Sequence, residues 1–481
     1  MQAPLFARET GHLPPHDLAR CITDQLLHAF APAPQHRFNG EAQSSSSPDE
    51  TDQFARTLRA HAAGVSALAL EKFEGRLLVS GGSEGSIKIW DLDEPSTPHA
   101  RHVFGPVSTI RRDTEGARVS GGGGHSHGVT HLAFYPFDQD AFLSSSYDKT
   151  LKLWATQRAA LTAQFDLNAT IYSHATSPLA DHLLVSCATQ HSNVRLVDLK
   201  SGAAVQALVS HGGPVLTTAW SPRREHVLAS GHADGKVRIW DVRRSGGPIA
   251  LLDQEDSVGI TAAEQTSRAH PRSQATAQAH DEPVNGLAWT DDGAYIVSAG
   301  LDRKVRVWDA ATGANTLASF GPLIQNQHVK TAAVVVPPSP AGASSGGRSS
   351  SGNMLVWPND HEILMLDLHH GNLLTRLRSP RGTSPPTRIT TLAWRSHGGG
   401  TSPNGRAGMG GNNSLGAIYS AHSDGQIRAW MPLIPGPDDI DDMDPPEEAA
   451  EEKSRKRKAI DSAYRSLMGR EITFTGAGAS R

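Results

Sequence analysis

A short phrase recurs along the chain, and a repeat of this kind constrains the fold more than any other feature. It reads Ser-Gly-Gly-Ser-Glu-Gly-Ser-Ile-Lys-Ile-Trp-Asp from Ser80 and Ser-Gly-His-Ala-Asp-Gly-Lys-Val-Arg-Ile-Trp-Asp from Ser230. Related versions begin at Ser144, Ser298 and Ser420. In each, a tight turn precedes a stretch in which apolar residues alternate with other residues, as in a half-buried strand. The pattern predicts a chain of repeated β-hairpins.

A histidine followed by an apolar strand precedes several phrases, as at His61 and His280. Together these features resemble the WD-repeat β-propeller, an all-β ring whose blades contain four antiparallel strands each. The resemblance implies that a His, a Ser or Thr, a turn Asp and the Trp share a hydrogen-bond network inside each blade. In the first blade Glu84 replaces the Asp, which predicts a weaker network. The predicted networks of the fourth and fifth blades are His211, Ser230, Asp234 and Trp240, and His280, Ser298, Asp302 and Trp308.

Two further repeats are degenerate, with Val197 and Leu366 at the Trp position. With them, the blade-closing positions predict a seven-bladed ring: Trp90, Trp154, Val197, Trp240, Trp308, Leu366 and Trp430. Prolines after Trp430 exclude a further inner strand there, so the seventh blade needs an outer strand from elsewhere. Phe54–Leu58 is the expected strand, because pairing it there would remove an open sheet edge.

The composition excludes several classes of function. A net charge of -4 provides no basic field for nucleic acid, so direct sequence-specific DNA binding is not expected. Cys21 and Cys187 are too few for a disulfide framework or a thiolate zinc site. No apolar run is long enough to cross a membrane, so a membrane partner is not expected either.

The Ser, His and Asp residues within the blades could suggest a hydrolase triad. Their repetition argues for a structural role, because an enzyme needs one such site with an oxyanion hole beside it. The run His125-Ser126-His127 lacks a cysteine or acidic partner at metal-ligand spacing, and His127 is predicted to be the blade histidine. We therefore expect no catalytic residue, no cofactor and no metal.

The sequence predicts four parts: an N-terminal helical segment (1–40), a linker (41–53), the propeller with long inserted loops (54–435) and a charged tail (436–481). Leu18, Ile22, Leu26 and Phe30 recur every four residues and predict an amphipathic helix over Pro14–Ala31. This helix either folds back on the ring or docks in a partner's groove. In the tail, the basic run 453–458 is either part of a solvated tail or a nuclear-import signal.

Segments outside the shared phrase narrow the resemblance, chiefly Leu5–Gly11, Ile171–Pro178 and Trp220–Arg244. They resemble the Cockayne syndrome group A family, in a fungal form with longer loops. The resemblance implies a nuclear, non-catalytic substrate receptor of a cullin-4 RING ubiquitin ligase in transcription-coupled nucleotide-excision repair. The implied partners are the ligase's large damaged-DNA-binding adaptor, through it cullin-4 and a RING subunit, a Cockayne syndrome B type translocase and stalled RNA polymerase II. The alternative is a general scaffold propeller in chromatin or RNA processing.

Two parts of this sequence match the adaptor-binding elements of that family. They are the N-terminal residues Phe6, Arg8, Leu18, Ile22 and Leu26, and the Trp-Asp-x-Arg signature Trp240, Asp241 and Arg243. Arg243 either faces the adaptor or forms a salt bridge with Asp241. Deletion of Met1–Ala31, or Arg243→Glu, is expected to abolish adaptor binding while the propeller stays folded.

Overall fold

The computed structural model describes residues 9–10, 29–34, 36–40, 58–93, 102–113, 123–179, 182–244, 247–256, 277–326, 334–336, 354–379, 387–395 and 417–432. All of them belong to the first of two units of the chain, Met1–Pro432. The second unit, Leu433–Arg481, lies outside the described residues, and so do the charged tail and the basic run within it. In the described ranges, no helix is long and apolar enough to cross a membrane.

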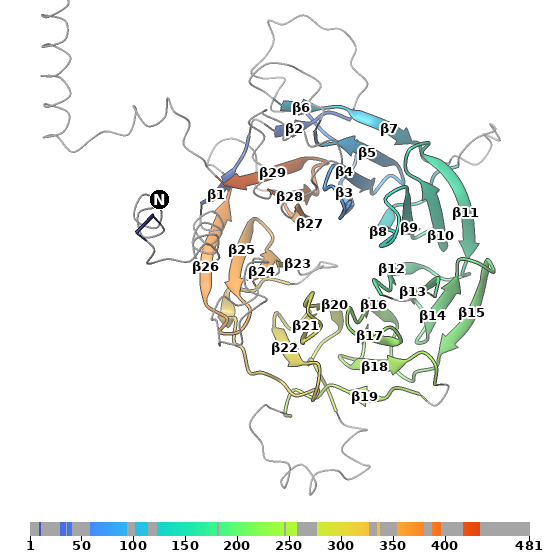
Figure 1. Cartoon of the computed structure of the whole chain (residues 1–481), viewed down its shortest axis with the longest axis vertical. Coiled ribbons are helices and arrows are strands. Elements are labelled where there is room, and N and C mark those ends of the chain that lie inside the picture. The colour runs from blue at the N-terminus through green and yellow to red at the C-terminus, as the bar shows by residue number, and fades with distance from the viewer. Residues whose placement is uncertain are drawn as a thin grey trace, which may run out of the picture. The chain divides into compact units, whose positions relative to one another are not determined.

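The fold is an all-β, seven-bladed propeller, as the repeat predicted (Figure 1). From the inner strand outward, the first three blades are β3 (Val65–Leu70), β4 (Leu77–Gly82), β5 (Ile87–Asp91) and β7 (Pro106–Ile110); β8 (Val129–Phe134), β9 (Ala141–Ser146), β10 (Thr150–Ala155) and β11 (Ala160–Asp166); and β12 (Ile171–Thr176), β13 (Leu184–Thr189), β14 (Val194–Asp198) and β15 (Ala203–Leu208).

The remaining blades follow the same order around the ring. They are β16 (Val215–Trp220), β17 (Val227–His232), β18 (Val237–Asp241) and β19 (Ala250–Leu251); β20 (Val284–Trp289), β21 (Tyr295–Gly300) and β22 (Val305–Asp309); β23 (Val334–Val336), β24 (Met354–Pro358), β25 (Glu362–Asp367) and β26 (Leu373–Arg378); and β27 (Ile389–Arg395), β28 (Ala417–His422) and β29 (Ile427–Pro432). In the fifth blade, an isolated bridge from Asn315 to Trp308 stands at the outer position, and a 3₁₀ helix, η1 (Gly321–Leu323), follows.

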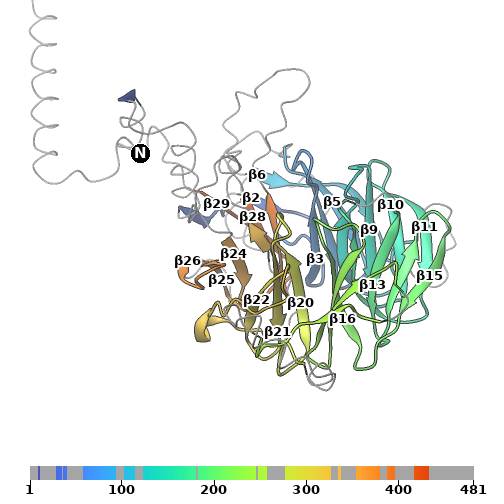
Figure 2. The same ribbon diagram turned by 60° about the horizontal axis from the view of Figure 1, so that its bottom comes forward.

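Antiparallel connectivity gives the ring two faces. The loops between first and second strands, and between third and fourth strands, must lie at the same end of every blade. We name this end the lower face, and the opposite end, which carries the second-to-third-strand turns, the upper face. Figure 2 shows strands running between the two faces. An ion pair of 2.8 Å joins Arg395, at the lower-face end of β27 in the seventh blade, to Asp93 in the loop after β5 of the first blade.

The core lies largely between neighbouring blades. One cluster joins Leu78 and Trp90 of the first blade to Tyr419 and Ile427 of the seventh. Each blade can bury both faces of its sheet only against its neighbours, so a full ring is needed to complete the core. Burying one large side chain of this kind contributes about 1.5–3 kcal/mol.

The ring is closed by an N-terminal strand, but the prediction that Phe54–Leu58 supplies it was wrong. The outer strand of the seventh blade is β1 (Phe30–Pro32), which pairs antiparallel with β29 so that Phe30 lies opposite Pro432. Leu58 is outside any strand, and Phe54–Thr57 lie outside the described residues. The predicted helix was also wrong at its end, because Phe30 and Ala31 are in β1. Pairing with the exposed edge of β29 overrides the helical spacing at Phe30.

After β1 the chain crosses to the first blade, and we name residues 30–40 the strap. Its strand β2 (His36–Phe38) pairs in parallel with β6 (His102–Phe104). The ring of Phe38, whose residue is 2% exposed, packs edge-on against Trp90 at 5.2 Å and stacks on Phe104 at 5.1 Å. At the end of the strap, Lys88 Nζ donates to the carbonyl oxygen of Gly40 at 2.9 Å. The strap therefore fastens the seventh blade to the first.

Candidate functional site

The fifth blade contains a complete hydrogen-bond network. His280 lies with Nδ1 3.0 Å from Asp302 Oδ1 and with Nε2 2.7 Å from Ser298 Oγ, and the indole N–H of Trp308 donates to the same serine at 2.8 Å. In the first blade, Glu84 makes the corresponding contact with His61 at 2.9 Å, so the longer acid completes the same set of contacts. Other closing tryptophans donate to the serine ten residues earlier in the same way: Trp90, Trp154, Trp240 and Trp430, at 2.7–2.8 Å.

In the fourth blade the prediction of His211 was wrong. Its side chain is exposed, and its carbonyl oxygen accepts a hydrogen bond from Arg238 Nη2 at 2.8 Å. Ser230 Oγ is instead 2.8 Å from His232 Nε2, and Asp234 pairs with Arg238 at 2.7 Å. His232 contacts Ser230 because residues two apart on a strand point to the same side of the sheet, which places the His232 ring beside the serine. Ser-x-His in the sequence was the signal that could have identified it.

The seventh blade repeats this second arrangement, with Ser420 Oγ 2.9 Å from His422 Nε2. In the second blade the predicted His127 was also wrong, because that residue is exposed. His125 takes its place, with Nδ1 2.8 Å from Asp148 and Nε2 2.6 Å from Ser144. Two nearby histidines fit the spacing, and only the three-dimensional path of the loop decides between them.

The network serines cannot present a nucleophile. The five at the start of the repeated phrases are 0% exposed: Ser80, Ser144, Ser230, Ser298 and Ser420. Burial also lowers the pKa of the His280 imidazole. Burial alone would raise the pKa of Asp302, but hydrogen bonds from His280 and Arg306 lower it to about 2. The arrangement is a neutral imidazole beside an ionised carboxylate, with no access for a substrate, and it holds the blade together.

The free energy of unfolding is expected to fall as the pH is lowered from about 6.5 toward 3. Burial, followed by the charges of Arg238 and Arg428, lowers the pKa values of His232 and His422 to about 3. In this window the unfolded chain binds a proton at each histidine and the folded chain does not. Each therefore lowers stability by roughly 1.4 kcal/mol per pH unit. Urea unfolding at pH 7, 6 and 5 measures the slope.

Variants assign this slope to the two histidines. His232→Gln and His422→Gln keep a side chain that can hydrogen-bond to serine but remove the titrating group, so each should make the pH dependence shallower than in the unmodified protein. An unchanged slope in both variants would show that other groups dominate acid unfolding.

The basic residues that alternate with the apolar ones are parts of the blades. Lys152 Nζ donates to the carbonyl oxygens of Gly123 and Gly124 at 2.9 and 2.7 Å. Arg306 Nη1 lies 3.0 Å from Asp302 Oδ2, and its side chain is 11% exposed. These cations bind the loops and turns of their own blades instead of forming a surface patch.

The Trp-Asp-x-Arg signature places one exposed cation on the lower face. Trp240 is 1% exposed and belongs to the core, so it cannot contact a partner directly. Arg243 donates from Nε and Nη2 to the two oxygens of Asp241 at 3.0 and 2.9 Å, and its side chain is 66% exposed. These hydrogen bonds lower the pKa of Asp241 to about 2. The salt bridge considered from sequence is therefore present, and it orients a guanidinium that still faces outward.

The N-terminal candidates Phe6, Arg8, Leu18, Ile22 and Leu26 lie outside the described residues. The direction of β1 nevertheless fixes where the segment before it meets the ring. Phe30 is paired with Pro432, and Pro432 is the lower-face end of β29. The chain before Phe30 therefore reaches the ring at the lower face, the same face that carries Arg243.

Large apolar side chains are exposed on the lower-face loops between these two points. Phe73, Phe137 and Leu179 are 51%, 50% and 45% exposed and lie in the first loops of the first, second and third blades. The sequence analysis missed them. Their signal was a large apolar residue inside an otherwise polar turn, which is informative only when several such residues share one face.

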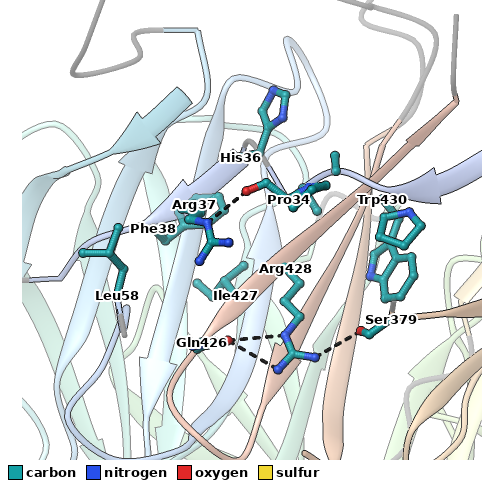
Figure 3. A pocket seen from close by; sticks show the side chains of 13 residues that line it. Pro34, His36, Arg37, Phe38, Leu58, Ser379, Gln426, Ile427, Arg428 and Trp430 are labelled. Carbon is teal, nitrogen blue, oxygen red and sulfur yellow. Dashed lines mark hydrogen bonds between the residues drawn. The ribbon is translucent and has the colours of Figure 1, made fainter. Parts of the chain in front are cut away.

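A groove lies between the strap and the seventh blade (Figure 3). Arg37 of β2 and Arg428 of β29 both line it. Arg37 Nε donates to the carbonyl oxygen of Pro34 at 2.9 Å, and Arg428 Nη1 donates to Ser379 Oγ at 3.1 Å. Sequence reasoning could not find this groove, because its walls come from segments that are far apart in the sequence.

No group of three or more His, Cys, Asp or Glu residues that could hold a metal occurs among the residues that the structure describes. Burial raises the pKa of the Cys187 thiol to about 12, so that thiol is not a reactive site.

The family model described as WD domain, G-beta repeat matches residues 52–91, 118–155, 202–241 and 271–309. WD repeat-containing protein ATCSA-1 of Arabidopsis thaliana is 29% identical over 318 residues, which cover 54% of this chain and 69% of that protein. Radiation-sensitive protein 28 of Saccharomyces cerevisiae is 26% identical over 38% of each chain. Ribosome biogenesis protein YTM1 of Phaeosphaeria nodorum is 28% identical over 52% of this chain and 55% of that protein. The match therefore spans about half the length of the Phaeosphaeria relative and less than half the length of the yeast one. The repeat matches and the seven-bladed ring identify the chain as a WD40-repeat protein.

Proposed function

We propose that this chain is a non-catalytic substrate receptor of a cullin-4 RING ubiquitin ligase, acting in transcription-coupled nucleotide-excision repair. The observation that carries the proposal is that the point where the chain enters the ring, at Phe30, and the exposed Arg243 lie on the same face. The names of two relatives support this reading, since one contains the letters CSA and the other is termed radiation-sensitive.

In this proposal the large damaged-DNA-binding adaptor covers the lower face. Phe6, Arg8, Leu18, Ile22 and Leu26 anchor it near the seventh blade, and Arg243 contacts it at the fourth. The exposed Phe73, Phe137 and Leu179 lie along the arc between these blades, so a large partner could bury all three. Asp241 holds the Arg243 guanidinium in place, which lowers the entropy lost when a partner binds.

The adaptor connects the receptor to cullin-4 and a RING subunit, which leaves the upper face for targets. A Cockayne syndrome B type translocase and stalled RNA polymerase II are the proposed targets there. The receptor performs no chemistry and acts by raising the effective concentration of target lysines near the activated ubiquitin. The proposed location is the nucleus, with the basic run 453–458 as the import signal.

Deletion of residues 1–28 is expected to abolish capture of the purified adaptor while the melting temperature of the ring stays unchanged. The deletion must stop at His28, because β1 begins at Phe30 and removing it would open the seventh blade. Arg243→Glu is expected to weaken adaptor binding at least about tenfold, as for a central charged contact. Titration of adaptor onto immobilised receptor measures both effects.

The matched control is Lys304→Glu. Lys304 forms an ion pair of 3.2 Å with Asp281, both 55% exposed, but it follows the second-to-third-strand turn on the upper face. The Lys304→Glu substitution reverses a charge as Arg243→Glu does, and it should leave adaptor binding unchanged. Undiminished adaptor capture by both the deletion and Arg243→Glu would refute the proposal.

A second candidate is a scaffold propeller in another nuclear complex, in chromatin or RNA processing. It is favoured by the relatives named as ribosome biogenesis proteins, whose identities of 25–28% are close to that of the Arabidopsis relative. In that case the partners that co-purify with the chain would be assembly factors. The full chain would not capture the adaptor, so the deletion of residues 1–28 would have no adaptor binding to abolish.

A further inference from the structure

Ser379 lies directly after β26, where the sixth blade meets the groove between the strap and the seventh blade (Figure 3). Its hydroxyl oxygen accepts a hydrogen bond from Arg428 Nη1 at 3.1 Å, and the residue is partly exposed. The next residue in the sequence is Pro380. A serine followed by proline is the minimal sequence that proline-directed protein kinases phosphorylate.

The surroundings of Ser379 suit a phosphate. Arg428 Nη2 already binds Thr387 Oγ1 at 3.1 Å and the Asp424 carboxylate at 3.3 Å, whereas Nη1 faces the neutral Ser379 hydroxyl. The guanidinium therefore has its acidic partner on one side and a hydroxyl on the other. Arg37, from the strap, lines the same groove. A phosphate dianion attached to Ser379 would lie beside the Arg428 guanidinium, in a groove whose other wall carries Arg37.

We propose that Ser379 is a phosphorylation site and that its phosphate is bound by Arg428 and Arg37. In the reaction, Ser379 Oγ attacks the γ-phosphorus of ATP held by a proline-directed kinase. The new O–P bond forms, the bond from that phosphorus to the β–γ bridging oxygen breaks, ADP leaves and the hydroxyl proton passes to the kinase. This modification goes beyond the proposed receptor function and does not depend on it.

The consequence follows from where the three residues belong. Ser379 ends the sixth blade, Arg428 is in β29 of the seventh, and Arg37 is in the strap that closes the ring. Two charge-assisted contacts from one phosphate would join all three. Phosphorylation is thus a clamp that holds the strap on the seventh blade, and it should slow the local opening of the strap.

The test uses the full chain with phosphoserine installed at position 379 by genetic encoding. Hydrogen exchange of peptides covering residues 30–40 is expected to slow roughly tenfold or more, the ratio given by one charge-assisted bond. Phosphoserine at exposed Ser201, in a lower-face turn of the third blade, is the matched control and should change nothing in the strap. Arg37→Gln and Arg428→Gln should each remove the slowing, and Arg37→Gln covers the case in which loss of Arg428 disturbs the blade.

A purified proline-directed kinase should also phosphorylate the folded chain, and Ser379→Ala should remove the phosphate from the peptide that contains position 379. Two results would overturn the clamp: hydrogen exchange that is unchanged by phosphoserine at position 379, or phosphoserine that slows exchange equally in the Arg37→Gln chain and in the chain that keeps Arg37. Absence of phosphate at Ser379 after treatment, while a free Ser-Pro peptide reacts fully, would overturn the modification.

Discussion

Replacing Phe38 by alanine is expected to lower the free energy of unfolding by about 3–5 kcal/mol, the range for a buried phenylalanine. The side chain lies in the interface between the first and seventh blades, against Trp90 and Phe104, and an alanine would leave a cavity there. Because the strap also closes the ring, its loss should expose the edge of β29. Urea unfolding followed by tryptophan fluorescence measures the change.

Phe73→Ala provides the control for that experiment. Phe73 is 51% exposed on the lower face, so its truncation should change the free energy of unfolding by less than about 0.5 kcal/mol. If Phe38→Ala were as mild as Phe73→Ala, the strap would not be an essential part of the ring.

Asp302→Ala is expected to cost about 3 kcal/mol, because removing one partner leaves the others buried without it. The Asp302 side chain is 5% exposed and contacts both His280 and Arg306. Asp281→Ala, in the same blade, is the control, since Asp281 is 55% exposed and pairs with an equally exposed lysine. Its expected cost is below about 0.5 kcal/mol. Thermal unfolding of the two variants side by side measures the difference, and equal losses would contradict a structural role for the network.

The architecture was predictable because each blade carries its own local signals. The turn and the alternating strand before Trp90, Trp240 and Trp308 specify a hairpin within a short sequence window. Even the degenerate repeats at Val197 and Leu366 keep the apolar spacing of a buried strand, with both residues 0% exposed. Seven closing positions therefore sufficed to predict seven blades.

The closure of the ring was predictable only in outline. The prolines after Trp430 indicated that an outer strand had to come from elsewhere, but the edge of β29 accepts any extended segment. Phe30 carried a helical spacing with Leu26 and Ile22, and nothing local indicated that it pairs with Pro432 near the other end of the unit. Pairings over such sequence separations depend on the assembled ring, which a local pattern does not contain.

The candidate site was predictable in part for a similar reason. The signature placed Arg243 and Asp241 close together, and the structure shows their ion pair. The pattern of a histidine before the first strand predicted His211, whereas the histidine that contacts Ser230 is His232, two residues after it. The exposed Phe73, Phe137 and Leu179 share a face only because successive blades repeat one orientation. The two arginines of the groove, Arg37 and Arg428, come from β2 and β29, and neither segment alone carries a signal for the groove.

The most direct test of the proposed receptor function is quantitative mass spectrometry of proteins that co-purify with the full chain from ultraviolet-treated cells, compared with the chain lacking residues 1–28. The proposal predicts that the damaged-DNA-binding adaptor and cullin-4 are strongly enriched with the full chain and lost with the truncated one. Enrichment of ribosome-assembly factors in their place, unaffected by the truncation, would contradict it.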